Sequence, residues 1–177
     1  AVAYQHPILR NDVFMGVVDL VDNQAYLYEG FERTEISIPE DLVDEVAKAR
    51  DKLLEALSEF NDEVMELYLD GQEVPVELIR KATRKAVAGL LLVPVFTGAA
   101  YKNSGLQVLM DAVVDYLPSP IDVGAVVGTE PGNEEKSETR CPTPSDPFAA
   151  LAFKIIHDPY AGQQTFIRIY SGTISSG

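Results

Sequence analysis

A run of small residues follows an apolar segment near the middle of the chain, and this stretch is the best suited to bind a flat ligand. Residues 91–96 have the sequence LLVPVF, and four small residues come directly after them: Thr97, Gly98, Ala99 and Ala100. Small side chains let a planar group approach the backbone, whose N–H groups can then donate hydrogen bonds. The pattern is typical of a base-binding loop and also of an ordinary tight connection between a strand and a helix.

Residue types that carry out acid–base or nucleophilic chemistry are sparse in this chain. His6 and His157 have no carboxylate and nucleophile at a spacing that indicates catalysis, so we interpret both as structural. Cys141 is the only cysteine, which excludes an internal disulfide, and it stands in a predicted loop. No His/Cys cluster has metal-ligand spacing. We therefore expect no catalytic residue and no metal site in this chain.

Charge is distributed unevenly. The formal net charge of the 177 residues is −14, and the segment from Glu29 to Glu77 holds 16 acidic and four basic residues, a net −12. This balance disfavours binding to nucleic-acid phosphates, DNA included, and favours a basic protein partner for the segment, although many acidic runs are simply solvated. The carboxylates that we expect to meet such a partner are Glu45, Asp51, Glu55 and Glu59.

Three helices are predicted in this acidic part of the chain. The first begins near Pro39 and Glu40, and a second covers about 62–69. A third begins after Pro75 and ends at Gly89. Apolar residues recur at helical spacing along one face of the first helix: Leu42, Val46, Ala49, Leu53, Leu57 and Phe60. Upstream, alternation in 13–20 and 25–28 predicts a β-hairpin.

The second half of the chain is predicted to be a strand, a helix and then two more strands. Residues 91–96 are apolar enough for a buried strand, and Asn103 or Ser104 could cap the following helix. That helix has apolar residues at helical spacing and stops before two prolines: Leu106, Leu109, Met110, Val113, Leu117, Pro118 and Pro120. Residues 121–147 lack periodicity and are interpreted as a linker, whereas 149–156 and 165–174 have strand patterns.

Four runs together point to a known family: FMGVVDLV, IPEDLVDEV, GAAYKNSGLQVLMDAVVDYLPSP and DPFAALAFKIIHDPYAGQQTFIRIYSG. The two long runs closely resemble bacterial elongation factor G, the GTP-driven ribosomal translocase, and the two short ones resemble the subdomain inserted in that family's G domain. The motifs occur in the family's order and cover nearly the whole chain.

The resemblance implies an α/β fragment in four parts. Residues 1–89 would form the inserted α+β subdomain, with a hairpin and three helices, and 90–120 the last strand and helix of a P-loop GTPase domain. Residues 121–147 would be a linker or long loop, and 148–177 the truncated start of a β-barrel domain.

The resemblance also implies a function. Gly98, Ala99 and Ala100 match a loop that in the family usually contains Gly-Ser-Ala and donates backbone amides to the guanine carbonyl oxygen. The family's phosphate-binding loop, switch regions and NKxD-type motif are absent from this sequence. We expect a parent protein that binds GTP and magnesium, hydrolyses GTP and acts on the ribosome, whereas this chain alone would be inactive and hold neither ligand. The acidic insert would dock the ribosomal stalk protein.

Two alternatives stay open. A ribosomal-protection GTPase of the tetracycline-resistance type shares the architecture, and a free-standing acidic protein-binding module would explain the charge without an enzymatic parent. The longest apolar run, 90–96, is far below the roughly 20 residues that a membrane helix needs, and the first residues do not form a secretory signal. We therefore expect a cytoplasmic protein with no membrane association.

Overall fold

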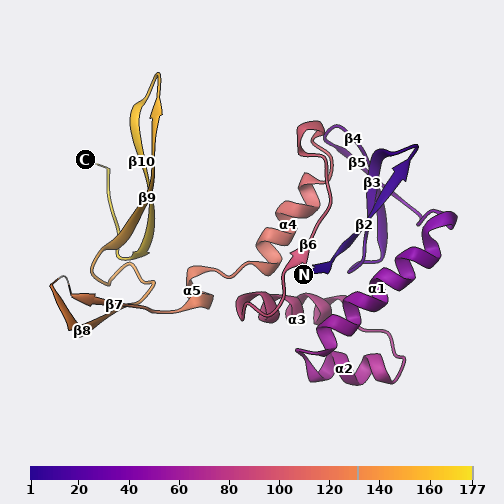
Figure 1. The fold of residues 1–177 in the computed structure, drawn as a ribbon, viewed down its shortest axis with the longest axis horizontal. Coiled ribbons are helices and arrows are strands. Elements are labelled where there is room, and N and C mark those ends of the chain that lie inside the picture. The colour runs from indigo at the N-terminus through magenta and orange to yellow at the C-terminus, as the bar shows by residue number, and fades with distance from the viewer. Residues whose placement is uncertain (131, 177) are drawn as a thin grey trace. The chain divides into compact units, whose positions relative to one another are not determined.

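The computed structural model describes residues 1–130 and 132–176. The chain divides into two compact units, Ala1–Leu117 and Pro118–Gly177. Figure 1 shows the first unit as a mixture of helices and an antiparallel sheet and the second as mainly hairpins. The class is therefore mixed α/β, and each unit is described by itself below.

A four-stranded antiparallel meander forms the sheet of the first unit. Its strands lie in the order β2 (Gln5–Arg10), β3 (Val13–Asp19), β4 (Gln24–Glu29) and β5 (Glu32–Ile36). Tight turns join them, with positive φ at Asn23 and Gly30. The predicted hairpin is confirmed as β3–β4, and β2 and β5 extend it on either side.

The three helices between residues 43 and 88 follow the apolar period of the sequence. A 3₁₀ turn (Glu40–Leu42) leads into α1 (Val43–Ser58), followed by α2 (Asp62–Leu69) and α3 (Val76–Ala88). Asn61 caps α2, its side chain accepting a hydrogen bond from the Val64 amide at 3.0 Å. The residues that α1 and α3 bury lie at helical spacing: Val46, Leu53, Leu57, Ile79, Ala82, Thr83, Ala86 and Val87.

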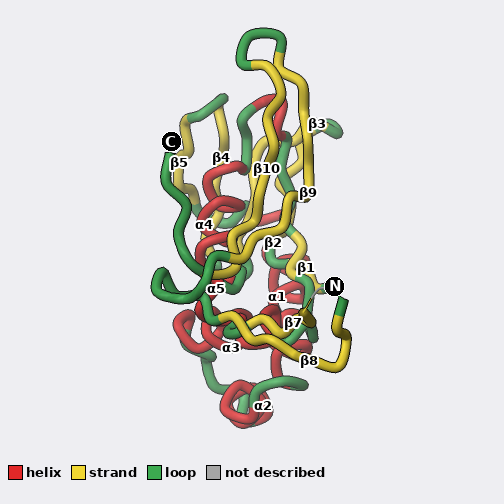
Figure 2. The backbone as a smooth tube through the Cα atoms, turned by 90° about the vertical axis from the view of Figure 1, so that its left-hand side faces the viewer, coloured by secondary structure: helices red, strands yellow, loops and turns green. Residues whose placement is uncertain are grey.

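Alternation along β3 sends side chains to both faces of the sheet. Val18 and Leu20 belong to the main core with α1 and α3, whereas Val17 packs with Tyr26 and Tyr28 on the other face. Figure 2 draws the strands in yellow and the helices in red. α1 and α3 pack on the first face, and Tyr26 on the other face lines a cavity together with Val108 and Ala112. Both faces of the sheet are therefore partly covered.

The predicted buried strand at 91–96 is wrong. Only β6 (Pro94–Val95) is a strand, and it pairs in parallel with β1 (Val2–Ala3) in a two-stranded sheet. Leu91 and Val93 are 60% and 63% exposed, and Leu92 is buried. Among the described residues no third strand pairs with either edge of this sheet.

The helix after the loop, α4 (Leu106–Tyr116), differs from expectation in two ways. Gly105, with φ of +84°, stands at the N-cap position in place of Asn103 or Ser104. The buried face consists of Val108, Ala112 and Tyr116. The expected apolar residues are 40–61% exposed at Leu109, Met110, Val113 and Leu117. This helix is apolar on both faces, so periodicity alone could not select the one that packs.

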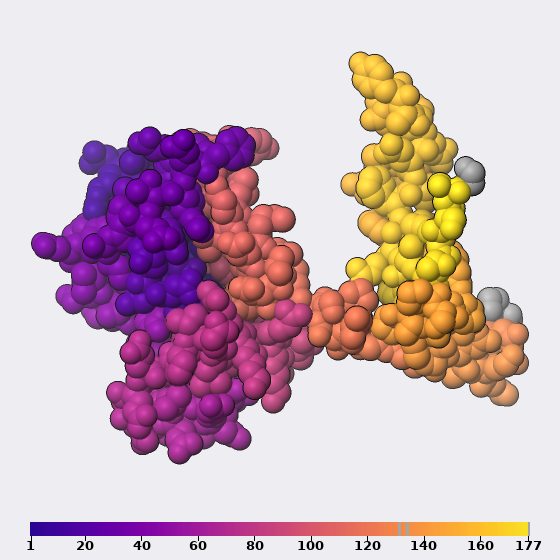
Figure 3. Space-filling model, turned by 180° about the vertical axis from the view of Figure 1, so that it is seen from behind, coloured from indigo at the N-terminus to yellow at the C-terminus, as the bar shows by residue number. Residues whose placement is uncertain are grey.

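The second unit contains α5 (Pro120–Val123) and two antiparallel hairpins. One pairs β7 (Val126–Glu130) with β8 (Asn133–Arg140), so the irregular linker expected at 121–147 is wrong for this stretch. The other pairs β9 (Ala149–Asp158) with β10 (Gly162–Ser171), which confirms the two predicted strands. Figure 3 shows this hairpin as a narrow projection, yellow at its C-terminal end. The described strands form no closed barrel.

Candidate functional site

Backbone hydrogen bonds close the loop between β6 and α4. The Ala99 amide donates to the Ser104 carbonyl at 2.9 Å, and the Ser104 amide donates back at 3.2 Å. A Cβ on Gly98 would lie 3.0 Å from the Ser104 oxygen. A Cβ on Gly105 would lie 3.0 Å from the Thr97 oxygen, at a positive φ that favours glycine. The two arms of the loop therefore approach closely because both positions lack a side chain.

Two backbone donors of this loop remain available. The Ala99 amide is used within the loop, but among the described residues nothing accepts a hydrogen bond from the amides of Gly98 or Ala100. Both residues are exposed, whereas Ala99 is half-buried. Of the three residues singled out in the sequence, Ala99 shapes the loop, while Gly98 and Ala100 offer donors.

An apolar groove of about 350 Å³ opens beside these donors. Its size falls within the range of small-molecule sites, roughly 300–1,000 Å³. It is lined by Pro94, Phe96, Thr97, Gly98, Ala100, Ser104, Gly105, Leu106 and Leu109. An apolar wall with a few polar donors at its rim suits a planar heterocycle.

Two glutamines connect the loop region to the four-stranded sheet. The Thr97 amide donates to Oε1 of Gln5 at 3.0 Å, across a sequence separation of 92 residues. Gln107, in the first turn of α4, donates from Nε2 to the carbonyl of Phe31 at 2.7 Å. Sequence reasoning missed both residues, since a glutamine in a strand or a helix carries no local signal of a distant partner.

The predicted acidic residues all lie exposed on α1 or at its C-terminal end. Glu45 and Asp51 have local partners: His6 Nε2 is 3.3 Å from the Glu45 carboxylate, and the Tyr68 hydroxyl donates to Asp51 at 3.0 Å. Within the described part of the chain, no hydrogen bond or ion pair engages the carboxylates of Glu55 and Glu59. These two are therefore the most available to a partner.

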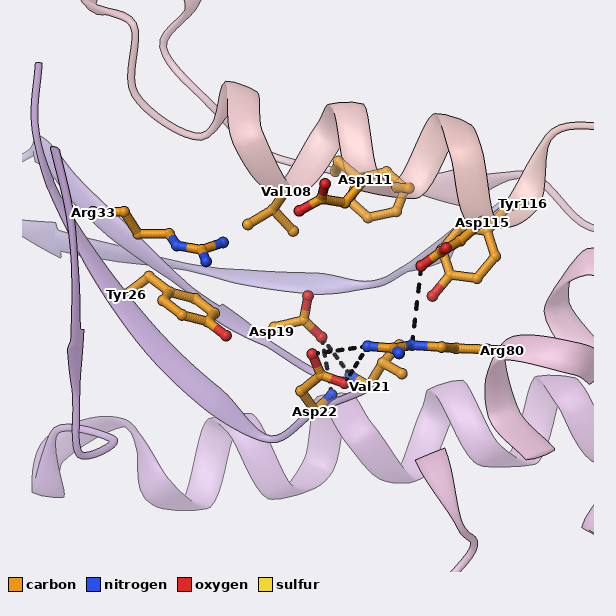
Figure 4. A pocket seen from close by; sticks show the side chains of 12 residues that line it. Asp19, Val21, Asp22, Tyr26, Arg33, Arg80, Val108, Asp111, Asp115 and Tyr116 are labelled. Carbon is orange, nitrogen blue, oxygen red and sulfur yellow. Dashed lines mark hydrogen bonds and ion pairs between the residues drawn. The ribbon is translucent and has the colours of Figure 1, made fainter. Parts of the chain in front are cut away.

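A polar cavity of about 70 Å³ between the sheet and α4 was not foreseen. Four carboxylates converge on it from the β3–β4 region and from α4, as Figure 4 shows: Asp19, Asp22, Asp111 and Asp115. Arg80 of α3 lies among them, 2.9 Å from Asp22 and 4.0 Å from Asp115. The cavity has room for about two water molecules.

Asp19 is the most buried carboxylate of this cavity, 7% exposed. One of its oxygens accepts from the amides of Val21 and Asp22 at 2.8 and 3.1 Å. Burial raises the pKa of Asp19, and the two amide hydrogen bonds oppose that rise only in part. The cluster joins β3, α3 and α4, and we interpret it as structural.

Two further sequence candidates belong to the second unit. His157 and Cys141 are exposed in the second unit. Among residues 1–130 and 132–176, no group of three or more His, Cys, Asp or Glu side chains could hold a metal ion. In the same ranges, no helix is long and apolar enough to cross a membrane.

Comparison with known proteins supports the fold. No protein-family model matches this chain. A crystal structure of a protein from Thermus thermophilus is similar over 97% of this chain, with a TM-score of 0.72 and 29% sequence identity. The matched region is 23% of that protein, so this chain spans less than a quarter of its length.

Proposed function

We propose that this chain is part of a translational GTPase similar to bacterial elongation factor G, in which the loop of Gly98 and Ala100 binds the guanine base. The observation that carries the proposal is the pair of unengaged amides beside the apolar groove. The sequence resemblance supports the same assignment. A ribosomal-protection GTPase would use the loop in the same way, so the proposal concerns the GTPase class.

The loop discriminates between purines by the direction of its hydrogen bonds. Guanine presents the O6 acceptor where adenine presents the N6 amino donor. A backbone N–H can donate to the first group but not to the second. A bound base covers these N–H groups, and a covered donor without an acceptor is costly. Adenine is therefore disfavoured, whereas guanine is favoured. Gly98 and Ala100 therefore supply base specificity without any side chain.

Phosphate and magnesium chemistry lies with other parts of the proposed parent. This chain contains no phosphate-binding sequence motif, and tight nucleotide binding depends on phosphate contacts. The matched Thermus protein is more than four times as long as the region it shares with this chain, which leaves room for such elements in a longer protein.

The acidic face of α1 supports a second element of the proposal, docking of a basic protein. Exposed carboxylates in a strongly negative segment attract basic surfaces over several ångströms and accelerate association. In the translational GTPase we propose, that partner is the ribosomal stalk protein. A free-standing acidic module would use the same face, but it would leave the loop donors unexplained.

Ala100→Pro in the full-length protein tests the base-binding role. Proline removes the N–H, and it suits the first position of the short helix Ala100–Lys102. Loss of one hydrogen bond is expected to weaken GDP binding about tenfold. Isothermal titration calorimetry with GDP and magnesium measures the effect.

Lys102→Ala is the control, because it changes the same short helix, Ala100–Lys102, at a residue that does not line the groove. GDP affinity should stay at the wild-type value in this variant. Wild-type affinity in Ala100→Pro, or no guanine-nucleotide binding by the wild-type full-length protein, would contradict the proposal.

A further inference from the structure

Gln5 is buried at the start of β2 with only 3% of its surface exposed. Its backbone pairs with Asp19 of β3, so its position is set by the four-stranded sheet. Its side-chain oxygen accepts the hydrogen bond from the Thr97 amide at 3.0 Å. Thr97 immediately precedes Gly98, so this bond orients the peptide from which the loop departs.

The polar atoms around this bond are only partly satisfied. Nε2 of Gln5 and Oγ1 of Thr97 are both buried without a hydrogen-bond partner among the described residues. An apolar residue at position 5 would remove the unpartnered Nε2, but it would leave the Thr97 amide without its acceptor. Glutamine therefore fixes the Thr97 amide at the cost of one unpartnered donor.

A second tether holds the other end of the loop. Gln107 lies two residues after Gly105, and its side chain donates to the Phe31 carbonyl in the β4–β5 turn at 2.7 Å. Gly98 and Gly105 approach one another closely, so the loop has little room to shift between its two attachments. Both attachments lead to the same sheet.

We propose that Gln5 is a positioning residue for base recognition: it holds the loop so that the amides of Gly98 and Ala100 point at the base, with Gln107 as the second anchor. The inference rests on the proposed guanine-binding function and deepens it. Base specificity is then set partly by the four-stranded sheet, which does not itself contact the nucleotide.

The test compares two variants of Gln5 in the full-length protein. Gln5→Met keeps the length of the side chain but removes the acceptor, whereas Gln5→Glu keeps an acceptor for the Thr97 amide. Affinity is measured for GDP and for the diphosphate of 2-aminopurine riboside, which lacks O6. We expect Gln5→Met to lose about tenfold in GDP affinity with little change for the analogue, and Gln5→Glu to keep the preference for GDP.

Gln24→Met is the matched control: the Gln24 side chain also bonds to the backbone, but it donates to the carbonyls of Ala25 in β4 and Ile36 in β5 and not to the loop. It should keep the wild-type preference. A folded Gln5→Met protein that keeps this preference overturns the inference. If Gln5→Met does not fold, Gln107→Met decides, and an unchanged preference there overturns it. A wild-type protein that does not prefer GDP over the analogue contradicts the proposed function itself.

Discussion

At the scale of single residues, Tyr4 shows how the first unit is joined. Its hydroxyl donates to Oγ1 of Thr83 at 2.7 Å, and Thr83 donates to the Ile79 carbonyl at 2.8 Å. Burial raises the pKa of Tyr4 to about 12. The ring lies 5.8 Å from Phe96 and 5.6 Å from Tyr116, centroid to centroid. One side chain thus connects the start of the chain with α3, β6 and α4.

Asp19 predicts a measurable pH dependence of stability. Because burial raises its folded-state pKa, the folded state binds this proton more tightly than the unfolded state does. Stability from this group is therefore greatest below the usual aspartate pKa and falls as the pH rises through the raised value. Asp19→Asn keeps an oxygen for the Val21 and Asp22 amides but cannot ionise.

As the pH rises from about 3, wild type should therefore lose stability relative to Asp19→Asn, so the difference between their free energies of unfolding changes in favour of the variant. Above the raised pKa of Asp19 this difference should stay constant. Urea unfolding at a series of pH values measures this. The other charged groups that line the cavity are present in both proteins: Asp22, Arg33, Arg80, Asp111 and Asp115. A constant difference in unfolding free energy at all pH values, or a wild type that gains stability relative to the variant as the pH rises, would contradict the raised pKa of Asp19.

At the scale of elements, the sheet and the exposed face of α1 differ in how well they tolerate amino-acid substitutions. A Cβ on Gly16 of β3 would lie 2.0 Å from the Tyr26 carbonyl oxygen, so this strand position excludes any side chain. The polar face of α1 tolerates substitution because Glu55 and Glu59 are exposed. Electrostatics on α1 can therefore be changed without disturbing the core.

Reversing Glu55 and Glu59 to lysine is expected to slow association with the C-terminal domain of the stalk protein about tenfold at low salt. The difference should shrink as salt is raised, because exposed charges separated by more than about 8 Å are largely screened at physiological ionic strength. Stopped-flow binding at two salt concentrations measures the rates, and circular dichroism checks the fold.

Reversal of Glu29 and Glu32 is the matched control, since it makes the same change in net charge at the end of β4 and the start of β5. A smaller effect is expected there, because these charges do not lie on the face of α1 that we propose for docking. Equal rates for wild type and the folded α1 variant would identify this face as ordinary solvated surface.

At the scale of the whole molecule, the two units differ in how their strands are paired. The sheet of the first unit has four strands and a core of helices against it, whereas β9 and β10 pair only with each other among the described residues. Large apolar side chains stay exposed along that hairpin: Leu151, Phe153, Ile155, Phe166, Ile167 and Ile169. A two-stranded hairpin is marginally stable in water.

Amides of β9 and β10 should accordingly exchange with solvent faster than those of α1 and α3 in a dilute solution of this chain. Hydrogen exchange followed by mass spectrometry compares the segments directly. Protection of the hairpin equal to that of the helices would show that its edges are covered, and a rise in protection with protein concentration would identify the cover as a second copy.

The helices and hairpins that have a local sequence pattern could be predicted from the sequence. Helices α1, α2 and α3 follow from apolar residues at helical spacing and from Asn61, Pro75 and Gly89 at their ends, and the β3–β4 and β9–β10 hairpins follow from their strand patterns and turns. The exposure of the α1 carboxylates follows from the same period. These features depend on neighbours within a few residues, which is why a pattern can predict them.

Which apolar surface is buried, and which polar groups meet, depends on the tertiary structure. The face of α4 with Val108 and Ala112 packs, although Leu109 and Val113 are as apolar, because Tyr4, just before β2, and Arg80 of α3 lie on that side. The bond from Thr97 to Gln5 spans 92 residues. Burial and distant hydrogen bonds depend on which elements come together, and the spacing of residues along one segment does not contain that information.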